Sequence, residues 1–259
     1  MKKTLLILLA LLLALGLVAC DPPVAQQTDA VTSAPAATEV PTPGSTAEPA
    51  PELVVVFTDP VLEELVRSAM NKPEGDITLA EAAAVTELKM EMDGSAQIAR
   101  VADVSDLKQF PNLTSLNLNW ALSDGDEVFD ISPLAGLTKL EYLYVCCANI
   151  SDISALAGMT NMKDLWIWGN NITDISALAG MTQIESLWIK GNQITDISVF
   201  ASMKNLVYLY MENNQVADLS PLAGLSKLTY VLLSGNPATD YSPLKDVYPN
   251  LEEKDFEIK

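Results

Sequence analysis

The C-terminal two thirds of the chain repeat one pattern of apolar and polar positions. The pattern follows the template Leu-x-x-Leu-x-Leu-x-x-Asn-x-Ile, and apolar side chains occupy positions 1, 4, 6, 11, 14, 17 and 20 of each period. Most periods are 22 residues long, but the first two are 28 and 27, so we expect inserted loops at about 93–98 and 123–127. Because positions 4 and 6 alternate with polar neighbours, each period predicts a short strand with two side chains pointing inward. The periods begin at Val85, Leu113, Leu140, Met162, Ile184, Leu206 and Leu228.

Two polar columns recur within this pattern. Position 9 is asparagine in four periods, where we expect the side-chain amide to satisfy backbone groups as the chain leaves the strand. Ala121 and Ala148 replace it in two periods, which predicts a different turn there. Aspartate also recurs, and although a file of carboxylates suggests calcium, we favour local capping of a turn by backbone hydrogen bonds. The asparagines are Asn170, Asn192, Asn214 and Asn236, and the aspartates are Asp130, Asp152, Asp174, Asp196, Asp218 and Asp240.

The asparagine column and the segment Thr-Asp-Ile-Ser-x-Leu-Ala-Gly-Met/Leu resemble the leucine-rich repeat family, most closely its bacterial internalin-like subclass with 22-residue repeats. The resemblance covers residues 85 to about 250, or about seven rungs. It implies an α/β leucine-rich repeat fold, a right-handed solenoid. In that fold a parallel β-sheet lines the concave face and 3₁₀ turns line the convex face.

The two ends of such a solenoid need a cover for the apolar core. Residues 53–84 predict a small N-terminal helical cap, with one helix starting at Asp59-Pro60. Thr78-Leu-Ala-Glu81 resembles a capping box before a second short helix, Leu79–Ala84. At the other end, residues 251–259 predict a degenerate closing strand in which Lys254 stands where leucine is expected.

The N-terminal residues predict delivery to a membrane. Residues 1–20 join a basic start to an apolar run, which is typical of a secretory signal. The run ends in Leu17-Val-Ala-Cys20, which resembles the bacterial lipobox and implies cleavage before Cys20 and a lipid on its side chain. An ordinary cleaved signal or an uncleaved anchor helix is the alternative. Residues 21–52 are rich in Pro, Ala and Thr and predict a disordered tether. We expect an extracytoplasmic protein, lipid-anchored to a bacterial cell membrane.

Composition narrows the classes of function. The formal net charge of -19 argues against a nucleic-acid partner, which is held mainly by Lys and Arg. The chain has no histidine, which excludes Ser-His-Asp and Cys-His catalytic sets and removes the commonest metal ligand. No nucleophile–base pair, metal-ligand spacing or phosphate loop is present, so we expect no catalysis, no metal and no cofactor.

The three cysteines do not form a disulfide framework. Cys146 and Cys147 are expected on the same face of the sheet. A disulfide between adjacent residues is strained, so we expect free thiols that fill space, with Cys147 near the missing asparagine at Ala148. An intermolecular disulfide is the alternative.

Aromatic side chains concentrate at positions that the repeat leaves free. All four tryptophans fall at positions 5, 7 or 8, and five of the seven tyrosines fall at positions 3 or 5. Adjacent strands lie about 4.8 Å apart, so position 5 predicts one stacked ridge. Aromatic neighbours also stabilise a sheet, but a broad exposed aromatic patch usually marks a binding surface. The candidate partner-binding residues are Tyr142, Tyr144, Asp164, Trp166, Trp168, Trp188, Lys190, Tyr208, Tyr210, Glu212 and Tyr230.

Two functions fit these residues. The internalin-like resemblance implies a protein-binding module that uses the concave aromatic face. A glycan or cell-wall polysaccharide that stacks on the same aromatic side chains, near Asp164, Glu212 and Asn117, is the alternative. In either case we expect a monomer held to the membrane through its N-terminal lipid.

Overall fold

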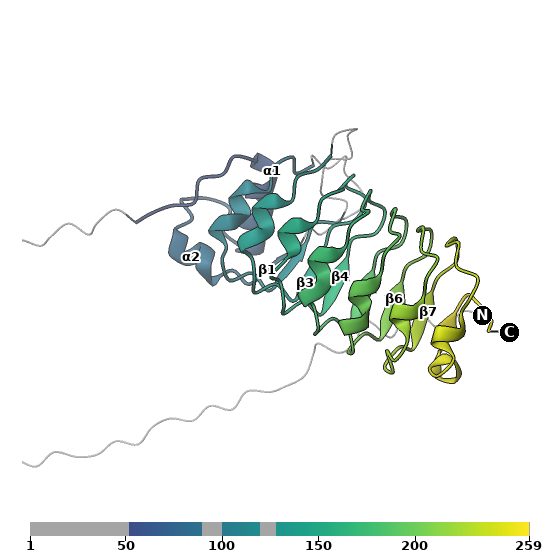
Figure 1. Cartoon of the computed structure of the whole chain (residues 1–259). Helices are drawn as coiled ribbons and strands as arrows, with labels where there is room; N and C mark the ends of the chain where they lie inside the picture. Colours follow the sequence, from purple (N-terminus) through teal and green to yellow (C-terminus); the bar gives the residue numbers. More distant parts are fainter. Residues whose placement is uncertain (1–51, 90–99, 120–127, 259) are drawn as a thin grey trace, which may run out of the picture. The chain divides into compact units, whose positions relative to one another are not determined.

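Short parallel strands follow one another in chain order to form a single sheet (Figure 1). The computed structural model describes residues 52–89, 100–119 and 128–258. They all belong to one compact unit, Ala50–Lys259, which is described by itself. The predictions that concern Cys20, the tether, Trp120, Ala121 and the two inserted loops lie outside the described residues. The strands are β1 (Glu87–Lys89), β2 (Ser115–Asn117), β3 (Tyr142–Tyr144), β4 (Asp164–Trp166), β5 (Ser186–Trp188), β6 (Tyr208–Tyr210), β7 (Tyr230–Leu232) and β8 (Glu253–Lys254).

The strand register confirms the repeat alignment derived from the apolar pattern. Position 5 of each rung pairs with position 5 of the next, as in Trp166 with Trp188 and Trp188 with Tyr210. Lys254 pairs with Val231, which is the apolar position 4 of the preceding rung, so the closing strand also lies where the sequence predicts it. Side chains at equal positions therefore form continuous columns across the sheet.

In the described residues, the core is formed mainly by the repeated apolar positions of the rungs. In the rung that begins at Ile184, each of these side chains is at most 1% exposed. Burying one such side chain completely stabilises the fold by about 1.5–3 kcal/mol. One rung alone cannot bury this set, because its neighbours supply the other half of the contacts. The seven side chains are Ile184, Leu187, Ile189, Ile194, Ile197, Phe200 and Met203.

Short 3₁₀ helices form a second layer next to the sheet (Figure 1). From η1 to η7, each contacts the next in chain order, just as the strands do. In front of the turns from η2 to η7, the repeated aspartate accepts a hydrogen bond from the backbone N–H two residues on, at distances of 2.7 to 2.9 Å. The expected capping is confirmed. The 3₁₀ helices are η1 (Ser105–Gln109), η2 (Ser132–Gly136), η3 (Ser154–Leu156), η4 (Ser176–Gly180), η5 (Ser198–Ser202), η6 (Ser220–Leu222), η7 (Ser242–Leu244) and η8 (Tyr248–Asn250).

The position-9 asparagines connect neighbouring rungs. Asn192 donates from Nδ2 to the carbonyls of Ile167 and Ile189 at 3.1 and 2.9 Å, and its Oδ1 accepts from the N–H of Ile172 at 3.1 Å. The structural role expected for this column is confirmed. These bonds satisfy backbone groups that would otherwise be buried without partners.

The rung in which Ala148 replaces asparagine turns differently, as predicted. Asn149 has a φ of +55°, whereas position 10 of the four following rungs is not left-handed. Asn170 of the next rung accepts from the N–H groups of both Ala148 and Ile150 through one oxygen. The bond from Ala148 has no counterpart at Asn192 or Asn214, whereas the bond from Ile150 matches those from Ile172 and Ile194.

Two helices precede the first strand, at the positions that the sequence predicts. α1 (Pro60–Ala69) begins after Asp59, whose Oδ1 accepts from the N–H groups of Val61 and Leu62. α2 (Leu79–Ala84) begins with the complete Thr78/Glu81 capping box. Among the described residues, no helix is long and apolar enough to cross a membrane.

Asp59 also ties α1 to the first rung. Its Oδ2 accepts from the N–H groups of Ala102 and Asp103 at 2.6 and 3.0 Å. Burial alone would raise the pKa of Asp59, but the four backbone hydrogen bonds together lower it below its usual value. One carboxylate thus holds both the helix start and the adjoining loop.

Candidate functional site

The outward side chains of the central strands form an aromatic ladder, which we define as Tyr144, Trp166, Trp188 and Tyr210. Trp166 and Trp188 stack with ring centroids 4.5 Å apart and planes at 26°. Trp188 and Tyr210 stack at 3.9 Å and 29°, and Tyr144 meets Trp166 edge-on at 4.9 Å. The predicted ridge is confirmed as a geometric feature.

The ladder has a specific orientation that the sequence does not reveal. The rings of Trp166, Trp188 and Tyr210 stack along the direction from strand to strand, so their planes stand upright on the sheet. Trp188 has Trp166 on one side and Tyr210 on the other, so both of its ring faces are covered. The stacked part of the ladder, from Trp166 to Tyr210, therefore presents ring edges outward, and these edges carry the partial positive charge of the ring hydrogens.

Polar side chains on the same strands hold the ladder in place. Asp164 accepts hydrogen bonds from Trp166 Nε1 at 2.8 Å and from the Tyr144 hydroxyl at 3.1 Å. The Ser186 hydroxyl accepts from Trp188 Nε1 at 3.1 Å. Sequence reasoning missed Ser186, although its place in the position-3 column beside Asp164 was a signal. These bonds restrict the ring rotamers before any partner binds.

Burial at the ladder shifts the ionisation of its polar groups. It raises the pKa of Asp164, although hydrogen bonds from Ser186, Tyr144 and Trp166 act in the opposite direction. It also raises the pKa of the Tyr144 hydroxyl, and the nearby charge of Asp164 adds to this effect. Tyr144 is therefore a neutral hydrogen-bond donor at physiological pH.

Further candidate residues flank the ladder. Tyr142 and Tyr208 are the most exposed, at 37% and 39%. Trp168 is half-buried, with Lys190 Nζ lying 5.2 Å from its ring centroid. The ring centroids of Tyr230 and Tyr208 lie 4.9 Å apart, and Glu212 lies two residues after the end of β6. All the predicted partner-binding residues thus lie on strands β3–β7 or directly after them, at outward positions of the same sheet.

The cysteine prediction needs one correction. Cys146 occupies an outward position but is only 1% exposed, so it contributes nothing to an exposed surface. Cys147 has a φ of +57°, and its sulfur lies only 2.8 Å from where a Cβ on Gly169 would stand. The thiol fills the space left by that glycine rather than a gap at Ala148. Both cysteines are free thiols, as expected.

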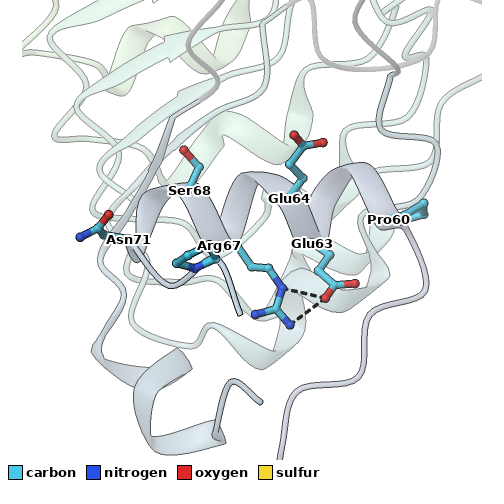
Figure 2. Close-up of a pocket in the computed structure, with 7 residues that line it drawn as sticks. Pro60, Glu63, Glu64, Arg67, Ser68 and Asn71 are labelled. Atoms are coloured by element: carbon cyan, nitrogen blue, oxygen red, sulfur yellow. Dashed lines mark hydrogen bonds and ion pairs between the residues drawn. The ribbon is translucent and has the colours of Figure 1, made fainter. Parts of the chain in front are cut away.

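A pocket lies elsewhere, beside α1 (Figure 2). Arg67 there binds Glu63 at 2.8 Å and donates to the carbonyl of Gly75 at 2.9 Å. Glu64 points away from this pair in Figure 2. Because the guanidinium is already engaged within the helix and the adjoining turn, this pocket offers a ligand little unpaired chemistry. Among the residues that the structure describes, no cluster of acidic or cysteine side chains could hold a metal ion.

Comparisons with known proteins agree with this architecture. Residues 160–202 and 204–246 match the model described as Leucine Rich repeats (2 copies). The structure is similar to that of internalin C2 from Listeria monocytogenes, with 27% identity, a TM-score of 0.62, and coverage of 82% of this chain and 100% of that one. Another Listeria monocytogenes internalin shows 28% identity and a TM-score of 0.63, covering 80% and 66% of the respective chains.

A leucine-rich repeat protein of Leptospira interrogans shares the fold at 21% identity and a TM-score of 0.53, covering 61% of this chain and 41% of that one. No curated protein matches the chain at a significant level. The fold is a leucine-rich repeat solenoid with structural neighbours among the internalins. This architecture is widely used for protein–protein interaction, because its stacked rungs create an extended surface.

Proposed function

We propose that this chain is a non-catalytic binding protein that recognises a protein partner through the aromatic ladder and its flanking residues. The observation that carries the proposal is the ladder itself. It groups four large side chains on one face, and it restrains them by stacking and by hydrogen bonds to Asp164 and Ser186. Rigid aromatic side chains lose little conformational entropy on binding and are frequent energetic centres of interfaces.

The orientation of the rings favours a protein over a glycan. Sugars bind aromatic residues by laying an apolar face on an exposed ring face. Both faces of Trp188 are covered by its neighbours, and Lys190 lies above the ring of Trp168. Upright ring edges instead suit the carbonyl oxygens and aromatic faces of a protein surface. Glycan recognition is therefore an outcome for the experiment to exclude.

Crosslinking tests where the partner binds. A photoreactive amino acid at exposed Tyr208 should crosslink a defined protein from cell-surface extracts, whereas the same group at exposed Ala179 in η4 should not. Replacing Trp166 and Trp188 with leucine should abolish the crosslink, because leucine keeps apolar bulk but cannot stack. Equal crosslinking from both positions would contradict the proposed face. If the protein bound one polysaccharide strongly on a glycan array, and Trp166→Ala abolished this binding, the proposed ligand would be a glycan and not a protein.

The proposal also places the protein outside the cell, held to a bacterial membrane by a lipid on Cys20 and by the tether at 21–52. The support is the sequence of residues 1–20. One acyl chain gives only marginal membrane binding, so stable anchoring needs more than one. In a bacterial host, Cys20→Ser should move the protein from the membrane fraction to the soluble or secreted fraction. An unchanged membrane fraction would refute the lipid anchor.

A further inference from the structure

Asp164 is a carboxylate that has hydrogen-bond donors but no cation beside it. Trp166 Nε1 donates to its Oδ1 at 2.8 Å, and the Tyr144 hydroxyl donates to its Oδ2 at 3.1 Å. The Ser186 hydroxyl is the third donor. These donors are neutral, so they orient the carboxylate but leave its charge unpaired. Among the described residues, no lysine or arginine forms an ion pair with Asp164.

The lysines next to β4 and β5 are engaged elsewhere. Lys163 Nζ binds a carboxylate oxygen of Glu141 at 2.6 Å, and Lys190 Nζ lies 5.2 Å from the ring centroid of Trp168. Burial raises the pKa of Asp164 despite its three hydrogen bonds, and neither lysine acts on it. Burial therefore disfavours the ionised form of this carboxyl group, and a cation arriving with a partner would favour it.

The position-3 column changes in side-chain size around Asp164. Tyr142 pairs with Asp164 in register, Asp164 pairs with Ser186, and Ser186 pairs with Tyr208. Two short side chains therefore lie between two tyrosines that are 37% and 39% exposed. Tyr208 has the ring of Tyr230 beside it, whereas no ring of the described residues stacks on Tyr142. The Tyr142 ring is thus available to a cation that approaches the neighbouring carboxylate.

We propose that Asp164 and Tyr142 bind a lysine side chain of the partner protein, with its ammonium against the carboxylate and beside the tyrosine ring. A carboxylate offers about four acceptor sites, and three donors already occupy sites on Asp164. The remaining site suits one ammonium N–H, whereas the fork of an arginine needs two. The net charge of -19 attracts a cationic partner from a distance. This inference rests on the proposed function and specifies the chemistry of the partner at the same face.

The Trp166 indole N–H reports on this site, because it donates to Asp164. The full-length protein in detergent carries isotope-labelled tryptophan, and NMR follows the indole signal that Trp166→Leu removes. The probes are the N-acetyl methylamides of lysine, norleucine and arginine. The lysine probe should shift the Trp166 signal saturably and bind about tenfold more tightly than the norleucine probe, which corresponds to about 1.4 kcal/mol. The arginine probe should bind more weakly than lysine. The lysine advantage should shrink as salt rises from about 0.05 to 0.5 M.

Variants separate binding by Asp164 from its role in holding the ladder. Asp164→Asn removes the charge but keeps an oxygen for the Trp166 N–H, and it should lower the affinity for lysine to that for norleucine. Tyr142→Leu leaves the donors of Asp164 in place and should weaken lysine binding about threefold, the loss expected for one exposed cation–π contact. Glu64→Gln removes one charge from the exposed face of α1 and is a matched control that should alter nothing.

Three results would overturn the inference. They are equal affinities for the lysine and norleucine probes, a lysine preference that survives Asp164→Asn, and the absence of any saturable shift with the lysine probe. An arginine probe that binds as tightly as lysine would overturn the choice of lysine, and unchanged binding by Tyr142→Leu would overturn the part assigned to that ring.

Crosslinking through Tyr208 distinguishes the failure of this inference from the failure of the proposed function. If Asp164→Asn crosslinks the partner as efficiently as the unchanged protein, the lysine site is wrong and the binding face stands. If the loss of Trp166 and Trp188 leaves the crosslink unchanged, the proposed use of the ladder is wrong.

Discussion

Replacing Asn192 with alanine should destabilise the protein far more than replacing its neighbour Gln193. The Asn192 side chain is buried and makes three hydrogen bonds, to the N–H of Ile172 and to the carbonyls of Ile167 and Ile189. Leaving one buried backbone group without a partner costs about 1–3 kcal/mol. Because water that enters the vacated space recovers part of this, we expect a total loss of about 3–5 kcal/mol. Gln193→Ala changes an exposed side chain and should cost under about 0.5 kcal/mol.

Asn236 provides an internal comparison. It makes the equivalent bonds to Val216, Met211 and Leu233, at 3.0, 2.9 and 2.9 Å, but is only partly buried. Water reaches its partners more easily, so Asn236→Ala should cost less than Asn192→Ala. Urea unfolding followed by circular dichroism measures both differences. Equal losses at the two positions, or a loss below about 1 kcal/mol for Asn192→Ala, would refute the role assigned to buried backbone groups.

Three further predictions address the helix start, one turn and the thiols. Asp59 has a lowered pKa, so its contribution to stability should be present above its unfolded pKa and lost as pH falls through its folded pKa. In the Asp59→Ala variant, the free energy of unfolding measured in urea should therefore depend less on pH between about pH 5 and 2. An unchanged pH dependence would contradict this. Gly169→Ala should lower the melting temperature more than Gly191→Ala. Both glycines have a positive φ, but only at position 169 would the added Cβ lie 2.8 Å from the sulfur of Cys147. Adding Cys147→Ala to the Gly169→Ala variant should restore most of the difference in melting temperature. In the native protein, a thiol reagent at pH 8 should label Cys147 and leave Cys146 unlabelled. Burial raises the pKa of both thiols, but the Cys146 side chain is also inaccessible to the reagent. Rapid labelling of both cysteines would contradict the burial of Cys146.

Much of the fold could be predicted because the structure of each rung follows from residues that are close together in the sequence. The apolar positions of a rung lie within 22 residues, so their spacing predicts which side chains point inward without knowledge of the neighbouring rungs. The aspartate before each 3₁₀ turn bonds to a backbone group two residues on, and such contacts follow from local sequence. The helix starts at Asp59 and Thr78 could be predicted for the same reason.

A second column of asparagines was not predicted. Asn161 and Asn205 donate to carbonyls of the preceding rung, at Thr138 and Thr182, and Asn112 donates to the carbonyl of Ala83 in α2. Each of these asparagines directly precedes the first apolar position of a rung, where the repeat template specifies no residue type. Their partners are 23 or more residues away in sequence, so the role became visible only once the rungs were stacked.

The amino-acid pattern was enough to predict the repeat, the register of the strands and the set of aromatic side chains on the outward face. It could do so because alternation along a strand decides which way a side chain points. Three properties came from the folded structure: Trp188 has both ring faces covered, Cys146 is buried at an outward position, and Glu212 Oε2 lacks a donor. These properties depend on rotamers and on packing between adjacent rungs, and no single rung contains that information.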